Sequence, residues 1–110
     1  MPNAMLTVYS SPSDPSREDE YNQWYDTVHA IDVLKIPGIV SCTRYKLSDT
    51  QMGEPGVPAN YMAVYEIELA ALADVPKNFL EKHLAGELPV SDVIAVGPMV
   101  FWDPASDRIS

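Results

Sequence analysis

Clusters of proline, glycine and serine divide the chain into segments whose apolar positions repeat with a strand or a helix period. Met5–Ser10 is short, apolar and rich in β-favouring residues, so we predict a strand that ends at the cluster Ser11–Ser16. From Arg17 to Leu34 the apolar residues recur every three or four positions. This spacing predicts an amphipathic helix with Ser16 as its N-cap and acidic residues in its first turn. Pro37-Gly38 ends the helical segment.

Four further segments of the chain have strand character or are ambiguous. Ile39–Leu47 and Tyr61–Glu68 are rich in β-branched and aromatic residues, which favours strands. The segment Ser48–Ala59 between them contains glycine and proline and is predicted to be an exposed loop. Leu88–Val96 fits neither period, and Pro98–Asp103 is predicted to be the final strand.

A second helix completes the predicted elements. Leu69–Ala85 has helical spacing, but proline disrupts a helix interior, so we place the firm helix after Pro76 and its end at Gly86. The resulting order, βαββαβ, is that of the ferredoxin-like split βαβ fold. We therefore predict an α+β protein with a four-stranded antiparallel sheet and both helices on one face.

The other face of this sheet has no predicted cover. Tyr61, Ala63, Tyr65 and Ile67 point to one side of the third strand, yet Met62 and Val64 on the opposite side are also apolar. A strand that borders water should alternate polar and apolar residues more regularly. Because large apolar patches are rare on monomers, we expect a second copy to cover the face, giving a homodimer that pairs through its sheets.

Length and composition restrict the class of protein. The 110 residues are 46% hydrophobic and carry a net charge of −9, which indicates one acidic domain spanning residues 1–110. The charge argues against nucleic acid and anionic membranes as partners. One cysteine excludes an internal disulfide framework. No apolar run reaches the length of a membrane span, and no basic stretch precedes an apolar one at the start, so we expect a cytoplasmic protein.

His29 carries the strongest chemical signal. On a helix it shares a face with Tyr25, and Asp26 and Asp32 each lie three residues away. Apolar neighbours such as Trp24 would shift the pKa of an imidazole that already titrates near neutrality, which suits general acid–base catalysis. The alternative is an ordinary residue at the boundary of the core, with its second ring nitrogen in water.

Strand tyrosines are further candidates for a polar site. Tyr45 and Tyr65 are able to point at the helices, and Tyr9 and Tyr61 are able to do so in one register. Several buried hydroxyls would give a pocket both apolar walls and hydrogen-bond donors. The alternative for each tyrosine is ordinary sheet packing with the hydroxyl at the rim.

The remaining candidate signals favour structural roles. Arg44 on a strand is expected at a solvated edge, although it is able to grip a carboxylate. Cys42 is expected to be a small core residue. His83 lies four residues before Glu87, but a metal site with His29 would need two more ligands that the sequence does not supply. We therefore expect no metal and no cofactor.

Part of the chain resembles a known family. The run Glu20-Tyr21-Asn22-Gln23-Trp24-Tyr25-Asp26-Thr27-Val28-His29, followed by Val33-Leu34, Ile36-Pro37-Gly38 and Arg44-Tyr45, resembles the EthD-like branch of the dimeric α/β-barrel superfamily. The resemblance covers residues 5–47. It departs from the usual family text after the histidine, where Ala30-Ile31 replaces Leu-Pro.

The resemblance implies ferredoxin-like protomers that pair into a barrel, with a cavity between each sheet and its helices. Members of the superfamily include cofactor-free monooxygenases, polyketide cyclases, muconolactone isomerases and haem-degrading oxygenases, and a histidine on the first helix recurs as the polar group of the cavity. By analogy, His29 is the candidate catalytic residue here.

We thus predict a cofactor-independent enzyme that acts on a hydrophobic carbonyl- or phenol-bearing compound by isomerisation, cyclisation or a monooxygenase-like reaction. His29 would move a proton, and Tyr25 and Tyr65 would hold the developing oxyanion. A cavity of a few hundred Å³ is expected. Its walls would come from Trp24, Val28, Val8, Tyr45 and Phe101. The alternatives are a non-catalytic binding protein for a hydrophobic metabolite and a haem-handling oxygenase.

Overall fold

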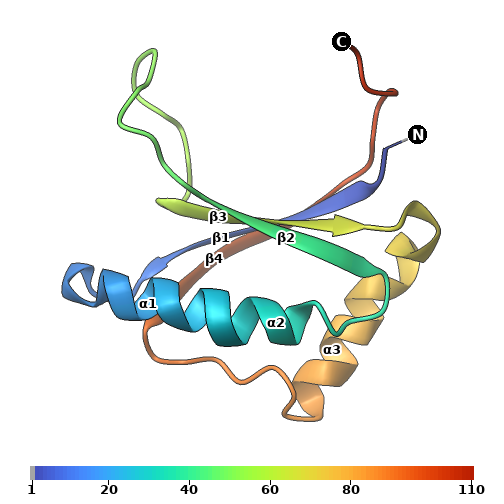
Figure 1. Cartoon of the computed structure of the whole chain (residues 1–110), viewed down its shortest axis with the longest axis horizontal. Helices are drawn as coiled ribbons and strands as arrows, with labels where there is room; N and C mark the ends of the chain where they lie inside the picture. The colour runs from blue at the N-terminus through green and yellow to red at the C-terminus, as the bar shows by residue number, and fades with distance from the viewer. Residues whose placement is uncertain (1) are drawn as a thin grey trace.

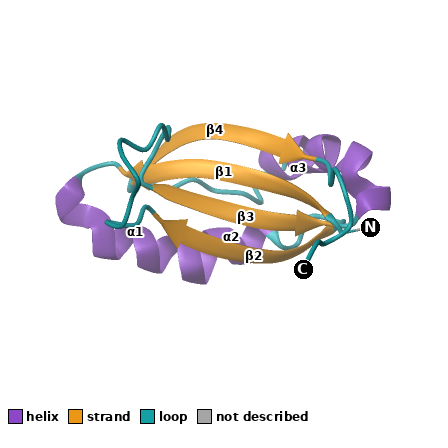
Figure 2. Cartoon of the chain, turned by 90° about the horizontal axis from the view of Figure 1, so that it is seen from above, coloured by secondary structure: helices purple, strands orange, loops and turns teal. Residues whose placement is uncertain are grey.

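The computed structural model describes residues 2–110 and contains a four-stranded antiparallel sheet in the order β2-β3-β1-β4, with its helices on one face (Figures 1 and 2). The predicted α+β, ferredoxin-like βαββαβ arrangement is confirmed. The strands are β1 (Ala4–Pro12), β2 (Ile39–Lys46), β3 (Tyr61–Ile67) and β4 (Ile94–Trp102). The helical segments are η1 (Pro15–Arg17), α1 (Glu18–Trp24), η2 (Tyr25–His29), α2 (Ala30–Val33), η3 (Leu69–Asp74) and α3 (Val75–Leu84).

The first helix contains a widened turn at its centre. α1, η2 and α2 follow one another without a break, but η2 is a π-helical turn in which the N–H of Ala30 bonds to the carbonyl of Tyr25, five residues back. A single π turn inside an α-helix is uncommon and is frequently found at functional sites. The hydrophobic periodicity predicted one continuous α-helix over this stretch and gave no sign of the wider turn.

The start of this helix differs from the prediction. The side chain of Asp14, not Ser16, caps the first helical turn, because its carboxylate accepts a hydrogen bond from the backbone N–H of Ser16 at 2.8 Å. Aspartate caps a helix start as well as serine does. The sequence cluster held several suitable caps, and it did not distinguish between them.

Two strands also extend beyond their predicted limits. β1 continues through Pro12 because its last two residues pair only with β4, which leaves the missing N–H of the proline at an open position of the ladder. β4 begins at Ile94, not Pro98, so the ambiguous stretch before Pro98 is partly strand. In contrast, the end of the second helix at Gly86 is confirmed, with φ of 74° at that glycine.

Strand alternation places the core on the helix-facing side of the sheet. Leu6, Val8 and Tyr65 are buried there, together with Tyr21 and Val33 from the first helix. The core therefore lies between the central strands and the first helix. No helix among residues 2–110 has the length and apolar character needed to cross a bilayer.

The opposite sheet face has no helix over it, as predicted. Met5, Tyr45 and Trp102 point to this side and remain 39%, 53% and 47% exposed. Trp102 lies over Thr7 and donates a 2.9 Å hydrogen bond to its hydroxyl. The loop between β2 and β3 and the C-terminal segment both project from this side of the sheet (Figure 1). The uncovered face therefore lies between two projecting segments.

Gly38 provides a test of the turn that follows the first helix. It has φ of +94°, and a Cβ built there would lie 2.6 Å from the Cβ of Ala71. Replacing Gly38 by Ala should lower the free energy of unfolding by about 2 kcal/mol or more, since the strained φ and the contact both oppose the side chain. Chemical denaturation measures the change.

The matched control is Gly56→Ala, because a Cβ at Gly56 meets nothing within 4 Å. That variant should change the free energy of unfolding by no more than about 0.5 kcal/mol. Equal stability of the two variants would contradict the turn geometry described here.

Candidate functional site

A cavity of about 130 Å³ lies between the sheet and the helices. Val8 and Tyr65 contribute from the central strands, His29 comes from the π turn, and Phe79 and His83 come from α3. The remaining lining residues are apolar: Val33, Leu88, Val90, Ile94, Val96 and Met99. The volume is smaller than the few hundred Å³ that we predicted. The cavity suits a compact, largely apolar ligand.

His29 is held in this wall by two aromatic rings. Its imidazole stacks on Trp24, with ring centroids 4.8 Å apart and planes inclined by 19°. The ring of Tyr25 lies nearly perpendicular to the imidazole, at 85°, with centroids 5.0 Å apart. Ring contacts of this kind fix the orientation of the imidazole without using its nitrogen atoms.

The two ring contacts leave one nitrogen of His29 without a hydrogen-bond partner in the described part of the chain. Its Nδ1 is buried and has no hydrogen-bond partner among residues 2–110. Burial lowers the pKa of His29, the positive charge of Arg44 lowers it further, and the negative charge of Asp32 partly opposes both effects. The imidazole is consequently neutral near pH 7 and has a lone pair that is able to accept a proton.

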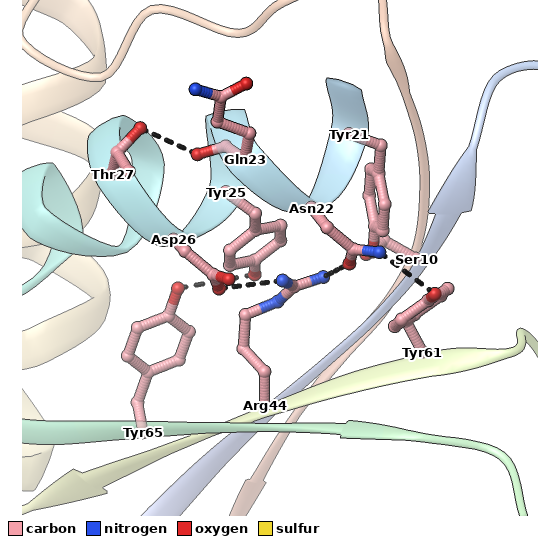
Figure 3. Close-up of polar contacts among 10 residues, drawn as sticks. All are labelled: Ser10, Tyr21, Asn22, Gln23, Tyr25, Asp26, Thr27, Arg44, Tyr61 and Tyr65. Carbon is pink, nitrogen blue, oxygen red and sulfur yellow. Dashed lines mark hydrogen bonds and ion pairs between the residues drawn. The ribbon is translucent and has the colours of Figure 1, made fainter. Parts of the chain in front are cut away.

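The two predicted tyrosines meet in the core. The Tyr65 hydroxyl donates to the Tyr25 hydroxyl at 3.3 Å (Figure 3). Burial raises the pKa of Tyr25 to about 12, and burial also raises the pKa of Tyr65. Both side chains thus stay protonated at neutral pH and serve as hydrogen-bond donors. Tyr65 lines the cavity. Tyr25 does not line it, but its side chain contacts those of Tyr65 and His29, which do.

Arg44 lies on the edge strand β2, as expected, but its side chain is largely buried and grips a carboxylate instead of being solvated. Its side chain is only 13% exposed and forms an ion pair with Asp26 at 2.8 Å. A second guanidinium nitrogen donates to the Asn22 side-chain oxygen at 3.0 Å, and the guanidinium lies 4.3 Å from the ring centre of Tyr25 (Figure 3). The rings of Tyr21 and Tyr61 lie 5.1 and 5.4 Å away. The arginine therefore joins β2 to the first helix through several partners at once.

The two acidic neighbours of His29 have different ionic partners. Asp26 forms an ion pair with Arg44 and so joins the first helix to β2. A carboxylate oxygen of Asp32 lies 3.6 Å from the Lys35 Nζ. The negative charge of Asp32 acts to raise the pKa of His29. Asn22 extends the network by donating to the Tyr61 hydroxyl at 3.2 Å.

The structure separates the predicted wall residues into two groups. Val8 lines the cavity, and Trp24 supports His29 from behind. Val28 is 41% exposed and does not line the cavity, and Phe101 points to the helix side of β4 but is also outside the lining. Tyr45 lies on the opposite sheet face, so its predicted place in the wall is wrong.

The other sequence candidates follow strand register. Tyr61 faces the helices, whereas Tyr9 pairs with Met62 on the uncovered face. Cys42 packs against the core as predicted. Phe79, Leu88 and Met99 were not identified from the sequence, because they come from separate elements that only the tertiary fold brings together. Within residues 2–110 no three side chains of His, Cys, Asp or Glu form a group suited to a metal ion.

Comparison with known proteins agrees with this architecture. The structure of HapK from Hahella chejuensis superposes with a TM-score of 0.60 and 14% sequence identity, covering 97% of each chain. An ethyl tert-butyl ether D (EthD) family protein from Bacillus halodurans superposes with a TM-score of 0.55 and 15% identity, covering 94% of this chain and 99% of that one. The chain has an EthD-like, ferredoxin-type fold.

At these sequence identities the likeness shows the fold alone. No protein-family model matches the sequence, and no curated protein matches it. The fold places the first helix over the sheet (Figure 1), but the role of His29 has to be argued from this chain's own geometry.

The charges around His29 give a prediction. Replacing Asp32 by Asn should lower the pKa of His29, and replacing Arg44 by Gln should raise it, because the first change removes a stabilising negative charge and the second a repelling positive one. Titration of the His29 ring signals by NMR measures both shifts. Lys77→Gln, at an exposed position of α3, is the control and should leave the titration unchanged. Shifts of the same sign in the two variants would contradict the assignment.

Proposed function

We propose that the chain is a cofactor-independent enzyme that uses His29 as a general acid–base on a compact, hydrophobic carbonyl- or phenol-bearing compound. The observation that carries the proposal is a neutral imidazole, held against two aromatic rings, in the wall of an apolar cavity. A neutral base is poised to take a proton near pH 7, and an apolar wall strengthens its interaction with the charge that develops.

Tyr65 supplies the second catalytic group. Its side chain lines the same cavity and its hydroxyl stays protonated, so the one O–H that it donates to Tyr25 would turn to the oxygen on which negative charge develops. Tyr25 supports that hydroxyl from the core side. Removal of a proton beside a carbonyl and stabilisation of the enolate or phenolate oxygen are sufficient for isomerisation or cyclisation, and they are the first step of a cofactor-free oxygenation.

A model reaction tests the base without knowledge of the natural substrate. In 5-nitrobenzisoxazole, a base removes the hydrogen on the ring carbon, its electron pair forms the nitrile, and the N–O bond breaks to release a coloured phenolate. His29→Gln should lower kcat/KM for this elimination by about 100-fold or more, because a positioned base contributes about that much. Absorbance of the phenolate measures the rate.

The control for this experiment is Thr27→Ala, on the exposed side of the same π turn, where the hydroxyl bonds only to the Gln23 carbonyl. That variant should keep the wild-type rate. If His29→Gln binds the probe and reacts at the wild-type rate, the base is assigned wrongly. If the wild type binds the probe and shows no turnover, the chain is a binding protein for hydrophobic compounds instead.

We also propose that the protein acts as a homodimer that pairs through the uncovered sheet faces to form an α/β barrel. The support is the apolar character of that face, where Met5, Tyr45 and Trp102 are exposed, and its position between two projecting segments (Figure 1). Exposed apolar patches of this kind mark protein interfaces. The EthD-like fold is compatible with this arrangement.

A charge on the uncovered face should prevent this pairing. Val64 lies half-buried on the central strand β3 and points to the uncovered side. Sedimentation should find two chains of 12.2 kDa in the wild-type particle and one chain in Val64→Glu, since a buried unpaired carboxylate opposes association. Leu80→Glu places the same charge on exposed α3 and should leave the dimer intact. A monomeric wild type would overturn the proposal.

A further inference from the structure

The π turn brings a tryptophan onto the candidate base, which an unbroken α-helix would not do. Trp24 and His29 are five residues apart, and in an α-helix two such side chains point about 140° away from each other around the axis. The π turn is wider and is closed by a hydrogen bond between residues five apart, Ala30 and Tyr25. This widening lets the Trp24 indole and the His29 imidazole lie on one side of the helix and stack.

The stack has the geometry of a cation–π contact. The ring centroids are 4.8 Å apart and the planes are inclined by 19°, so the imidazole lies over the face of the indole. A cation within about 6 Å of an aromatic ring is attracted by the negative charge of its face, and tryptophan gives the strongest attraction. The neutral imidazole lacks this attraction, so the contact strengthens when His29 takes a proton. Trp24 is half-buried and packs against the core, which holds the indole in place.

Other cations leave this indole free within residues 2–110. The guanidinium of Arg44 lies 4.3 Å from the ring centre of Tyr25, so the second ring that contacts His29 already faces another cation. In the described part of the chain, the arginine and lysine contacts with aromatic rings are all made to tyrosines. The face of Trp24 is therefore left to His29.

The remaining groups around His29 give its cation little support. Burial and the positive charge of Arg44 both disfavour protonation, and the opposing carboxylate of Asp32 is also engaged in an ion pair. From the other elements, Tyr65 of β3 and His83 of α3 line the same cavity, and neither carries a negative charge at neutral pH. A base in this position therefore gains from a neutral group that favours its charged form.

We propose that Trp24 is a positioning residue whose indole face stabilises the imidazolium that forms when His29 takes a proton from the substrate. This role deepens the proposed function and rests on it. The attraction grows as the imidazole gains charge, so it favours the transition state over the resting enzyme. Trp24 itself gains no bond and no proton.

The expected sign distinguishes this role from ordinary packing. Desolvation disfavours an imidazolium, so an indole that only covered the ring would lower the pKa of His29. A cation–π contact raises that pKa. Fluorine on the indole draws electron density from the ring face but nearly preserves the size of the ring. A fluorinated Trp24 therefore keeps its cover over the imidazole and weakens only its attraction for the cation.

Fluorinated tryptophan tests the inference by NMR and needs no substrate. Trp102→Phe leaves Trp24 as the sole tryptophan, so growth with 5-fluorotryptophan alters only that ring. The pKa of His29 should fall by about 0.3 on labelling, a part of the roughly 0.4–0.7 that a cation–π contact at a partly exposed site contributes. Titration of the His29 ring signals measures the change. The rising limb of the pH profile of kcat/KM for 5-nitrobenzisoxazole should move to lower pH by the same amount.

The matched control carries the fluorine on the other indole. In Trp24→Phe the sole tryptophan is Trp102, which lies over Thr7 on the uncovered sheet face. Labelling of this variant should leave the pKa of His29 unchanged. Each comparison is made between labelled and unlabelled protein of the same variant, so the phenylalanine substitutions themselves do not enter the result.

The outcomes separate the two proposals. An unchanged or higher pKa of His29 in labelled Trp102→Phe overturns the role of Trp24, as does an equal fall in both variants. A fall confined to Trp102→Phe supports it. Failure of His29→Gln to slow the elimination of 5-nitrobenzisoxazole would instead overturn the proposed function, while the titration would still report whether the indole stabilises the imidazolium.

Discussion

The arrangement of the site depends on one buried cation. Arg44 projects from β2 into a space bounded by three tyrosine rings, where an unpaired charge would be strongly unfavourable. Asp26 and Asn22 on the first helix meet that requirement, and the ring of Tyr25 adds a cation–π contact. These partners lie close together on the first helix. Their contacts with the guanidinium therefore fix how far this part of the helix lies from the sheet and how it is rotated about its own axis.

The position of His29 follows from this constraint. The π turn begins at Tyr25, one ring of the arginine's surroundings, and ends at His29, so the histidine is carried by a segment that Arg44 holds in place. The same guanidinium charge disfavours protonation of the imidazole. A single side chain therefore contributes to both the geometry and the protonation state of the candidate base.

Much of the architecture could be predicted from the sequence, because strands and helices have their own periods. The alternating residues of β3 indicated which face meets the helices, and Pro37-Gly38 marked the end of the first helix. The π turn could not be predicted, since one wider turn hardly changes the apolar spacing over a whole helix. Arg44 was misplaced for a different reason: its partners lie on a separate element, and only tertiary packing shows that they enclose it.

The side chains of the cavity were predicted in part for the same reasons. His29 and Tyr65 could be identified because each follows the period of one element. Tyr45 was assigned to the wrong face, since the register of β2 shifts at an irregularity between Ile39 and Ser41 that the sequence does not reveal. His83 was considered only as a metal ligand, and its place in the cavity lining depends on how α3 crosses the sheet.

The two tryptophans occupy informative positions. Trp24 stacks on the imidazole of His29, whereas Trp102 covers Thr7 on the sheet face that has no helix. Each indole therefore reports a different event: the first is sensitive to whatever enters beside the histidine, and the second to whatever lies against the sheet. Fluorescence of proteins that retain only one of the two indoles would follow ligand entry and subunit association as independent optical signals.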